Sequence, residues 1–357
     1  MLQFVFSENK REKTDYSQII RRTYNVLIFE LKCDIFDFEY GIEDHVIFFE
    51  RKRRGKGEIV LAFRETPKHK WGDRRDAVWV KDAPGLNVLM GSLYPNRTDC
   101  EVYLKQEIDV TEILKYIDEK NSGEPEIKTT LFHCFVAMVA RVCNERPYLN
   151  RFIQGRRVYE RNDITISFLA KRRFSDHSEE SLMQYVARPD DDLNAISRFI
   201  VGDVNKMRSA PAATGITDTI NKIGHLPRPI LMLTVKIVRW LDFWGKTPGF
   251  LTEGDSNCAT VLMSNLGSIK CPSVYHHLNN YGTTSIFITI GKIHKGQEIM
   301  DDGSVQIRDF VDIGATLDER IADGFYFARS LKLIQHICNN PELLDLKLQE
   351  ESNYEFI

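Results

Sequence analysis

The sequence lacks most of the patterns that would place a 357-residue chain in a special class. It has no apolar run of about 20 residues, the length that a membrane-spanning helix requires. The longest mainly apolar stretch, residues 230–235, is followed by Lys236 and Arg239. There is no internal repeat and no low-complexity tract, and neither sign of charge dominates, since the net charge is −3. A transmembrane segment, a repeat fold and binding to nucleic acid are therefore not expected.

Cysteine is present without any pairing signal. The seven cysteines are an odd number, widely spread, with no C-x-x-C pair and no Cys/His cluster at zinc-ligand spacing. The first residues, MLQFVFSENKREK, are apolar over too short a length to serve as a signal peptide. We therefore predict reduced cysteines, no metal site and a soluble, cytoplasmic protein.

The composition is that of an ordinary globular protein, with 43% hydrophobic and 28% charged residues. We predict an N-terminal extension of unclear role over residues 1–57 and one domain over residues 58–357, which carries an additional helical segment at about 210–255. Within that segment, residues 230–244 form an amphipathic helix whose charges, Lys236, Arg239 and Asp242, are three residues apart. Packing against the core or a neighbouring subunit and contact with a membrane surface or an acyl chain are both open interpretations.

Helical and strand-like patterns alternate along the predicted domain. A helix with a continuous apolar face is predicted from about residue 128 to Pro147, and another over residues 325–338. Strand-like runs are predicted at the following ranges: 101–104, 157–159, 164–169, 259–263 and 285–290. This alternation indicates the α/β class.

Three sequence blocks resemble, in the same order, the catalytic domain of the 2-oxo-acid dehydrogenase (dihydrolipoyl) acyltransferases, and more distantly chloramphenicol acetyltransferase. The first is residues 129–152 (TTLFHCFVAMVARVCNERPYLNRF), a helix followed by a Pro-x-Leu-Asn signature. The second is residues 261–267 (VLMSNLG), similar to the Ser-Asn-Leu-Gly strand end of the family. The third is residues 318–324 (DERIADG), where the family has Asp-His-Arg-x-x-Asp-Gly, followed by a helix and residues 340–344 (NPELL).

The resemblance implies a chloramphenicol acetyltransferase-like fold, with a large mixed sheet flanked by helices. It also implies a homotrimer with active sites between subunits, a small-molecule acyl donor and acceptor, and a coenzyme A thioester as co-substrate rather than a covalently bound cofactor. Residues 1–57 are too short and of the wrong composition for a lipoyl domain. The chain is therefore expected to be a free-standing member of the family.

Acyl transfer needs a base for the attacking group and a hydrogen-bond donor for the oxyanion. The resemblance implies that one subunit supplies a histidine and the next a serine or threonine hydroxyl. Ser264 matches the hydroxyl position, whereas Glu319 stands at the histidine position. A carboxylate of ordinary pKa is a weaker base than imidazole by about two units, which corresponds to about 3 kcal/mol, or roughly a hundredfold in rate. Glu319 as a working base, loss of the chemistry and use of another base all stay open.

Other residues near these motifs are candidates for lesser or alternative roles. His276 and His277 follow the Ser264 strand and are the alternative bases, although a structural role is also open to them. The resemblance implies that Asp323 holds an arginine and shapes the loop. His133, inside the first block, is interpreted as a core residue. Together these residues predict an acyltransferase that uses a coenzyme A thioester, with a catalytically inactive trimer that binds an acyl-CoA or a partner protein as the alternative.

Overall fold

The computed structural model describes residues 38–43, 46–51, 70–171, 180–209, 224–252, 255–300 and 302–354. By its internal contacts the chain divides into two units, Met1–Glu58 and Ile59–Ile357. In the first unit, β1 (Phe38–Glu43) and β2 (Val46–Arg51) form an antiparallel hairpin. The rest of the predicted extension, and residues 210–223 of the predicted helical segment, lie outside the described residues.

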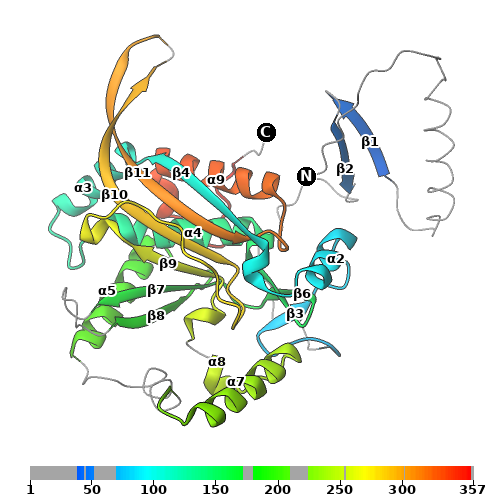
Figure 1. Ribbon diagram of the computed structural model, residues 1–357. Coiled ribbons are helices and arrows are strands. Elements are labelled where there is room, and N and C mark those ends of the chain that lie inside the picture. The colour runs from blue at the N-terminus through cyan, green and yellow to red at the C-terminus, as the bar shows by residue number, and fades with distance from the viewer. Residues whose placement is uncertain are drawn as a thin grey trace, which may run out of the picture. The chain divides into compact units, whose positions relative to one another are not determined.

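A six-stranded mixed sheet forms the centre of the second unit (Figure 1). Its strands, in spatial order, are β4 (Glu101–Asp109), β11 (Val305–Asp318), β10 (Ile286–Ile299), β9 (Val261–Asn265), β7 (Thr165–Lys171) and β8 (Glu180–Val186). β9 is parallel to both of its neighbours, β10 and β7, and the other pairs are antiparallel. A smaller antiparallel sheet has the order β3 (Ala77–Trp79), β6 (Arg157–Arg161) and β5 (Arg151–Gln154). The predicted α/β class with a large mixed sheet is confirmed.

Helices flank the large sheet. The described helices are α2 (Gly85–Leu93), α3 (Thr111–Ser122), α4 (Leu131–Glu145), α5 (Leu193–Ser209), α7 (Arg228–Phe243), α8 (Gly249–Thr252) and α9 (Gly324–Asn339). Apolar side chains recur along α4 at helical spacing, and almost the whole helix is buried. Its N-terminus is capped by the Thr130 hydroxyl, which accepts a hydrogen bond from the His133 amide.

The two faces of the large sheet have different neighbours, and this difference positions the candidate site. Met263 of β9 and Ile288 of β10 belong to the main core, together with residues of α4 and α9. Side chains alternate along a strand, so Ser264 and its partner Thr289 lie on the opposite face. The loop formed by residues 271–282 covers that face, since Thr289 Oγ1 contacts Val274 of the loop.

The three charged residues Lys236, Arg239 and Asp242 of α7 do not all lie on its surface. Lys236 and Arg239 are exposed, but Asp242 is buried and does not share their surface. Asp242 Oδ2 accepts a hydrogen bond from Gln154 Nε2 at 2.7 Å, and Asp242 Oδ1 lies 3.9 Å from Arg74 NH1. A spacing of three residues places charges near one another on a helix, but it does not say which side packs inward. Among the described residues, no helix is long and apolar enough to cross a membrane.

Candidate active site

Ser264 is held at the end of β9 by a tight strand-to-turn junction. Val261 and Met263 are buried in the core, whereas Ser264 is half-buried on the other face. Directly after the strand, a Cβ on Gly267 would lie 2.6 Å from the Gly291 carbonyl oxygen, so only glycine fits there. Asn265 Oδ1 accepts a hydrogen bond from the Ser268 amide at 3.3 Å. The Ser-Asn-Leu-Gly pattern is therefore explained by the turn that fixes the backbone of Ser264.

An open cavity of about 980 Å³ lies beside this junction, and Ser264 is among its lining residues. Its wall contains the apolar side chains of Phe132, Phe168, Ile200 and Val204 from α4, β7 and α5. Three exposed cations also border it, namely Arg208, Lys270 and Lys292. The cavity thus combines apolar surface with positive charge, a combination suited to a ligand with an anionic end and an extended apolar part. No sequence motif indicated these cations, because they come from three separate segments.

The loop of residues 271–282 places His276 on the sheet face that carries Ser264. The His276 ring stacks on Phe287 of β10, with ring centroids 4.3 Å apart. Phe287 is paired with Leu262, which lies two residues before Ser264 on β9. Ser264 is therefore displaced from the His276 position by about 7 Å along the strand direction. His277 follows on the same loop and lies 4.7 Å from His276 between ring centroids.

The hydrogen bonds of these two histidines fix their tautomers. His276 Nδ1 lies 2.8 Å from the His277 carbonyl oxygen, and His277 Nδ1 lies 3.2 Å from the Leu278 carbonyl oxygen. A carbonyl oxygen only accepts hydrogen bonds, so in the neutral ring Nδ1 carries the proton and donates it. The Nε2 atom of each ring then has a free lone pair, as a general base requires.

Asp318 and Arg320 form a buried ion pair beneath Glu319. Asp318 accepts hydrogen bonds from Arg320 Nε at 2.8 Å and from Arg320 NH2 at 2.7 Å. Arg97 Nε lies 3.5 Å from Asp318 Oδ2, a Coulombic contact without hydrogen-bond geometry. All three side chains are almost fully buried. Arg97 is a site residue that the sequence did not indicate, because it lies more than 200 positions before Asp318 in the chain.

Glu319 lies in the turn between β11 and α9. Its side chain is half-buried, and its amide donates a hydrogen bond to the Cys100 carbonyl oxygen at 3.0 Å. Burial raises the pKa of the neighbouring Cys100 to about 11, so this thiol is protonated at neutral pH. The described cysteines are free, and Cys33 lies outside the described residues.

Asp318 and Asp323 make different contacts in this loop. Among the described residues, the carboxylate that hydrogen-bonds an arginine here is Asp318. Asp323 is exposed and caps α9, since its Oδ1 accepts a hydrogen bond from the Tyr326 amide at 2.8 Å. Both residues shape the loop, Asp318 from below and Asp323 at the helix start.

Ser264 and Glu319 of one chain do not meet. Ser264 lies opposite Thr289, whereas the Asp318 amide donates to the Ser285 carbonyl oxygen, four residues earlier along β10. Four residues span about 13 Å and two strand spacings about 10 Å, which together give about 16 Å. Within one chain, the structure brings His276 closer to Ser264 than it brings Glu319.

His133 is a core residue, as predicted, but it also lines the cavity. Only 5% of the residue is exposed, and its Nδ1 has no hydrogen-bond partner among the described residues. Burial lowers its pKa to about 4, so the ring is neutral at pH 7. It lies on the first turn of α4, on the core side of the sheet, whereas the Ser264 side chain is on the other face.

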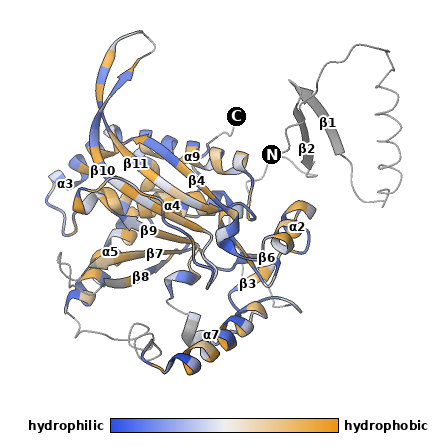
Figure 2. Cartoon of the chain, viewed as in Figure 1, coloured by the Kyte–Doolittle hydropathy of each residue, from blue (hydrophilic) through white to orange (hydrophobic). Residues whose placement is uncertain are grey.

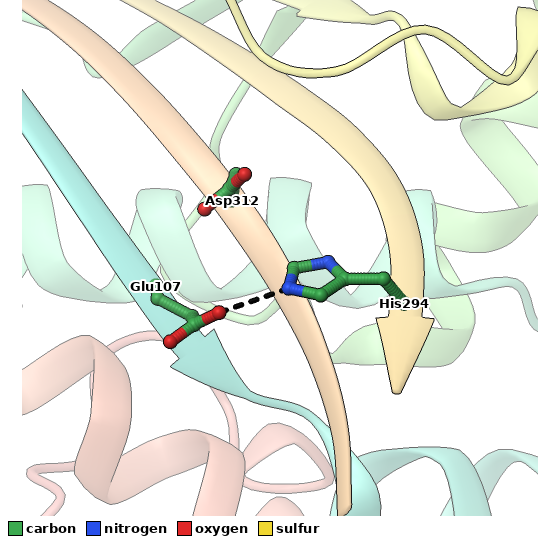
Figure 3. A group of neighbouring side chains, drawn as sticks. All are labelled: Glu107, His294 and Asp312. Carbon is green, nitrogen blue, oxygen red and sulfur yellow. Dashed lines mark hydrogen bonds and ion pairs between the residues drawn. The ribbon is translucent and has the colours of Figure 1, made fainter. Parts of the chain in front are cut away.

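A separate polar group on the sheet offers three potential metal ligands (Figure 3). Glu107 of β4 lies opposite Asp312 of β11, and His294 comes from β10. Their ligand atoms lie within 4.8 Å of one another. His294 Nε2 is 2.9 Å from Glu107 Oε1, and Lys105 Nζ is 3.4 Å from Asp312 Oδ1. Lys105 thus offsets part of the like charge of this cross-strand pair, and His294 is hydrogen-bonded to Glu107.

The sequence is similar to that of one known protein family and to one characterised relative. Residues 248–346 match the family described as 2-oxoacid dehydrogenases acyltransferase (catalytic domain). The lipoamide acyltransferase component of the branched-chain alpha-keto acid dehydrogenase complex of Bacillus subtilis (strain 168) is 23% identical over 291 residues. The match covers 78% of this chain, and the chain spans 57% of the length of that relative.

Solved structures with a similar chain path include a probable dihydrolipoamide acetyltransferase from Listeria monocytogenes. It has a TM-score of 0.49 and 18% identity, and the match covers 82% of this chain and 98% of that chain. A chloramphenicol acetyltransferase has a TM-score of 0.44 and 12% identity, covering 73% of this chain and 99% of that chain.

Proposed function

We propose that the chain, whose residues 248–346 match the 2-oxoacid dehydrogenase acyltransferase catalytic-domain family, transfers an acyl group from a coenzyme A thioester to a small-molecule acceptor. The observation that carries this proposal is the position of Ser264, fixed at a strand end on the border of the cavity. A hydroxyl held in this way can donate a hydrogen bond to the oxyanion that forms during acyl transfer.

The cavity suits a thioester donor of this kind. Coenzyme A carries phosphate groups at one end and a flexible arm of alkyl and amide groups that ends in the thioester. The cations Arg208, Lys270 and Lys292 would hold the phosphates, and the apolar wall would hold the arm. In this arrangement the thioester carbonyl would lie next to the Ser264 hydroxyl.

The base is assigned to Glu319 of a second copy in a homotrimer. Within one chain, Glu319 lies about 16 Å from Ser264, a distance too long for direct proton transfer through a shared acceptor. A site between copies places the two residues on the same substrate, as the family resemblance implies. The buried pair of Asp318 and Arg320 would then set the direction of Glu319.

A second assignment of the base is supported by the loop of residues 271–282. His276 lies on the same sheet face as Ser264, and its Nδ1 bond to the His277 carbonyl leaves Nε2 as the proton acceptor. In this arrangement the nucleophile would be activated within one chain, without Glu319.

The first experiment measures coenzyme A release from acyl-CoA in the presence of a panel of thiol, amine and hydroxyl acceptors. Ser264→Ala should lower kcat by about 10²- to 10³-fold, the usual effect of losing one oxyanion donor. Ser268→Ala is the matched control, because its hydroxyl is bonded to the Asn265 carbonyl oxygen at 2.8 Å, and it should lose less than about tenfold. Equal losses in the two variants would contradict the role of Ser264.

The second experiment decides which base is used. Ser264→Ala and Glu319→Ala are each prepared and assayed alone, and the two proteins are then mixed, unfolded and refolded together. If Glu319 acts across copies, about a quarter of the sites regain both intact residues, and activity returns. If His276 acts within the chain, Glu319→Ala keeps its activity, and a mixture of Ser264→Ala with His276→Ala stays inactive.

The alternative function is a catalytically inactive protein that binds an acyl-CoA or a partner protein, favoured by the replacement of the family histidine by Glu319. Calorimetric binding of acyl-CoA with no coenzyme A release for any acceptor would support this alternative. Measurable release that depends on Ser264 would exclude it.

A further inference from the structure

Helix α7 exposes many large apolar side chains. Its outward side chains, together with Trp244 just after the helix, are between 42% and 61% exposed, and they are Ile230, Met232, Leu233, Val235, Ile237, Trp240, Phe243 and Trp244. The helix lies at the periphery of the second unit, with apolar residues along much of its length (Figure 2). It precedes residues 248–346, which match the acyltransferase family. Exposed apolar side chains gathered on one helix in this way mark a contact surface.

The orientation of this surface is fixed by the single acidic residue of the helix. Asp242 points inward, where it accepts a hydrogen bond from Gln154 and lies near Arg74. A Cβ on Gly155 would lie 2.3 Å from the Phe243 carbonyl oxygen, so the helix end packs directly on the β5–β6 turn. Because these contacts fix one side of α7 against the protein, its apolar side faces outward.

The exposed charges of α7 and of the residues that follow it have one sign. Arg228, Lys236 and Arg239 on the helix and Lys246 after it are exposed, whereas the acid Asp242 is buried. We propose that α7 docks on the surface of an anionic lipid bilayer, lying in the plane of the membrane. Lipid headgroups supply phosphates for the cations, and the acyl-chain boundary accepts the apolar side chains. Trp240 and Trp244 have the amphipathic rings that favour this boundary.

The position of Lys236 favours a bilayer over a second copy of the chain. Lys236 is flanked on the outward side by Met232 and Leu233, one turn before it, and by Trp240, one turn after it. A dry protein interface would bury this ammonium and require a matched acid on the partner. At a bilayer its long side chain extends to the headgroups while the neighbouring apolar side chains insert.

The four tryptophans allow a direct test on the intact chain. They are Trp71, Trp79, Trp240 and Trp244, so Trp71→Phe/Trp79→Phe leaves fluorescence from the α7 region alone. Vesicles of phosphatidylcholine with phosphatidylserine should shift this emission to the blue and carry the protein into the pellet. Vesicles of phosphatidylcholine alone should bind at least tenfold more weakly, because the headgroups then carry no net charge. No blue shift and no pelleting with the anionic vesicles would overturn the proposal.

Amino-acid substitutions separate the apolar and the electrostatic contributions of α7 to vesicle binding. Leu233→Glu should abolish pelleting, and Lys236→Gln/Arg239→Gln should weaken binding to anionic vesicles by about 30-fold, the effect expected from two cations near an anionic surface. The matched control is Ile307→Glu on β11, a residue 71% exposed against 59% for Leu233, and its binding should equal that of the wild type. Equal loss in Ile307→Glu would show nonspecific adsorption and refute the role of α7.

Sedimentation velocity without lipid tests the alternative that a second copy of the chain, rather than a bilayer, binds to α7. If α7 mediates contact between copies, Leu233→Glu lowers the oligomeric state, and the bilayer proposal is overturned. An unchanged sedimentation coefficient, together with lost vesicle binding, supports it.

Discussion

Replacing Asp318 by Asn tests whether the buried ion pair holds the loop that carries Glu319. The carboxylate is fully buried, and it balances Arg320, which is 2% exposed, and Arg97, which is 4% exposed. Asn keeps one acceptor oxygen, but it places an NH₂ group where Asp318 Oδ2 meets Arg320 NH2 at 2.7 Å. Two buried guanidinium groups then remain without their shared anion. Breaking a buried pair in this way costs about 3–5 kcal/mol, a large part of the roughly 5–15 kcal/mol that stabilises a typical domain.

The assay is urea unfolding followed by fluorescence and circular dichroism, with Asp323→Asn as the control. Asp323 is an exposed helix cap, and Asn caps helices about as well as Asp, so this control should lose less than about 0.5 kcal/mol. A loss of under about 1 kcal/mol in Asp318→Asn, or equal losses in the two variants, would refute the reasoning.

Three further substitutions test other parts of the structure. Burial lowers the pKa of His133 to about 4 from the ordinary 6.5, so the folded state loses up to about 3 kcal/mol as the pH falls from 6.5 through 4. His133→Leu should remove that part of the slope in pH-dependent unfolding, and an unchanged slope would contradict it. In Gly314→Ala, the new Cβ would lie 2.6 Å from the Val274 carbonyl oxygen, so the 271–282 loop should shift and kcat should fall at least tenfold if His276 is the base. Arg141→Met removes the donors to three carbonyl groups of residues 346–350 and should lower the free energy of unfolding by about 2–4 kcal/mol, whereas an unchanged urea midpoint would argue against this role.

Elements with a regular apolar pattern were predicted within a few residues. α4 and α9 show helical spacing because one side of each helix packs on the large sheet. β11 was not predicted, because Val305 and Ile307 in its first half are exposed and charged residues interrupt the alternation before the buried part begins. A strand whose two halves lie in different environments has no single pattern along its length.

The candidate site was only partly predictable from the sequence, because local motifs indicate some of its residues and distant segments supply the others. Ser264 and Glu319 were indicated by motifs in which local turn geometry selects glycine and acidic residues. The partners of these residues, such as Arg97 beside Asp318, come from distant segments that only the folded chain brings together. The resemblance implied an arginine contact for Asp323, whereas in the folded chain Arg320 bonds to Asp318 and Asp323 caps α9.

The two candidate bases differ in how firmly the chain holds them. The loop of His276 is fastened to the sheet through the ring contact of Tyr275 with Tyr103, and through a hydrogen bond from the Leu278 amide to Glu101 Oε1. His276 is therefore in place in a single chain. Glu319 can reach the Ser264 site only from another copy, so activity that depends on it must fall when the protein is diluted below the dissociation constant of the oligomer. Activity per chain that is independent of protein concentration would favour His276, because a complete site then exists in every chain.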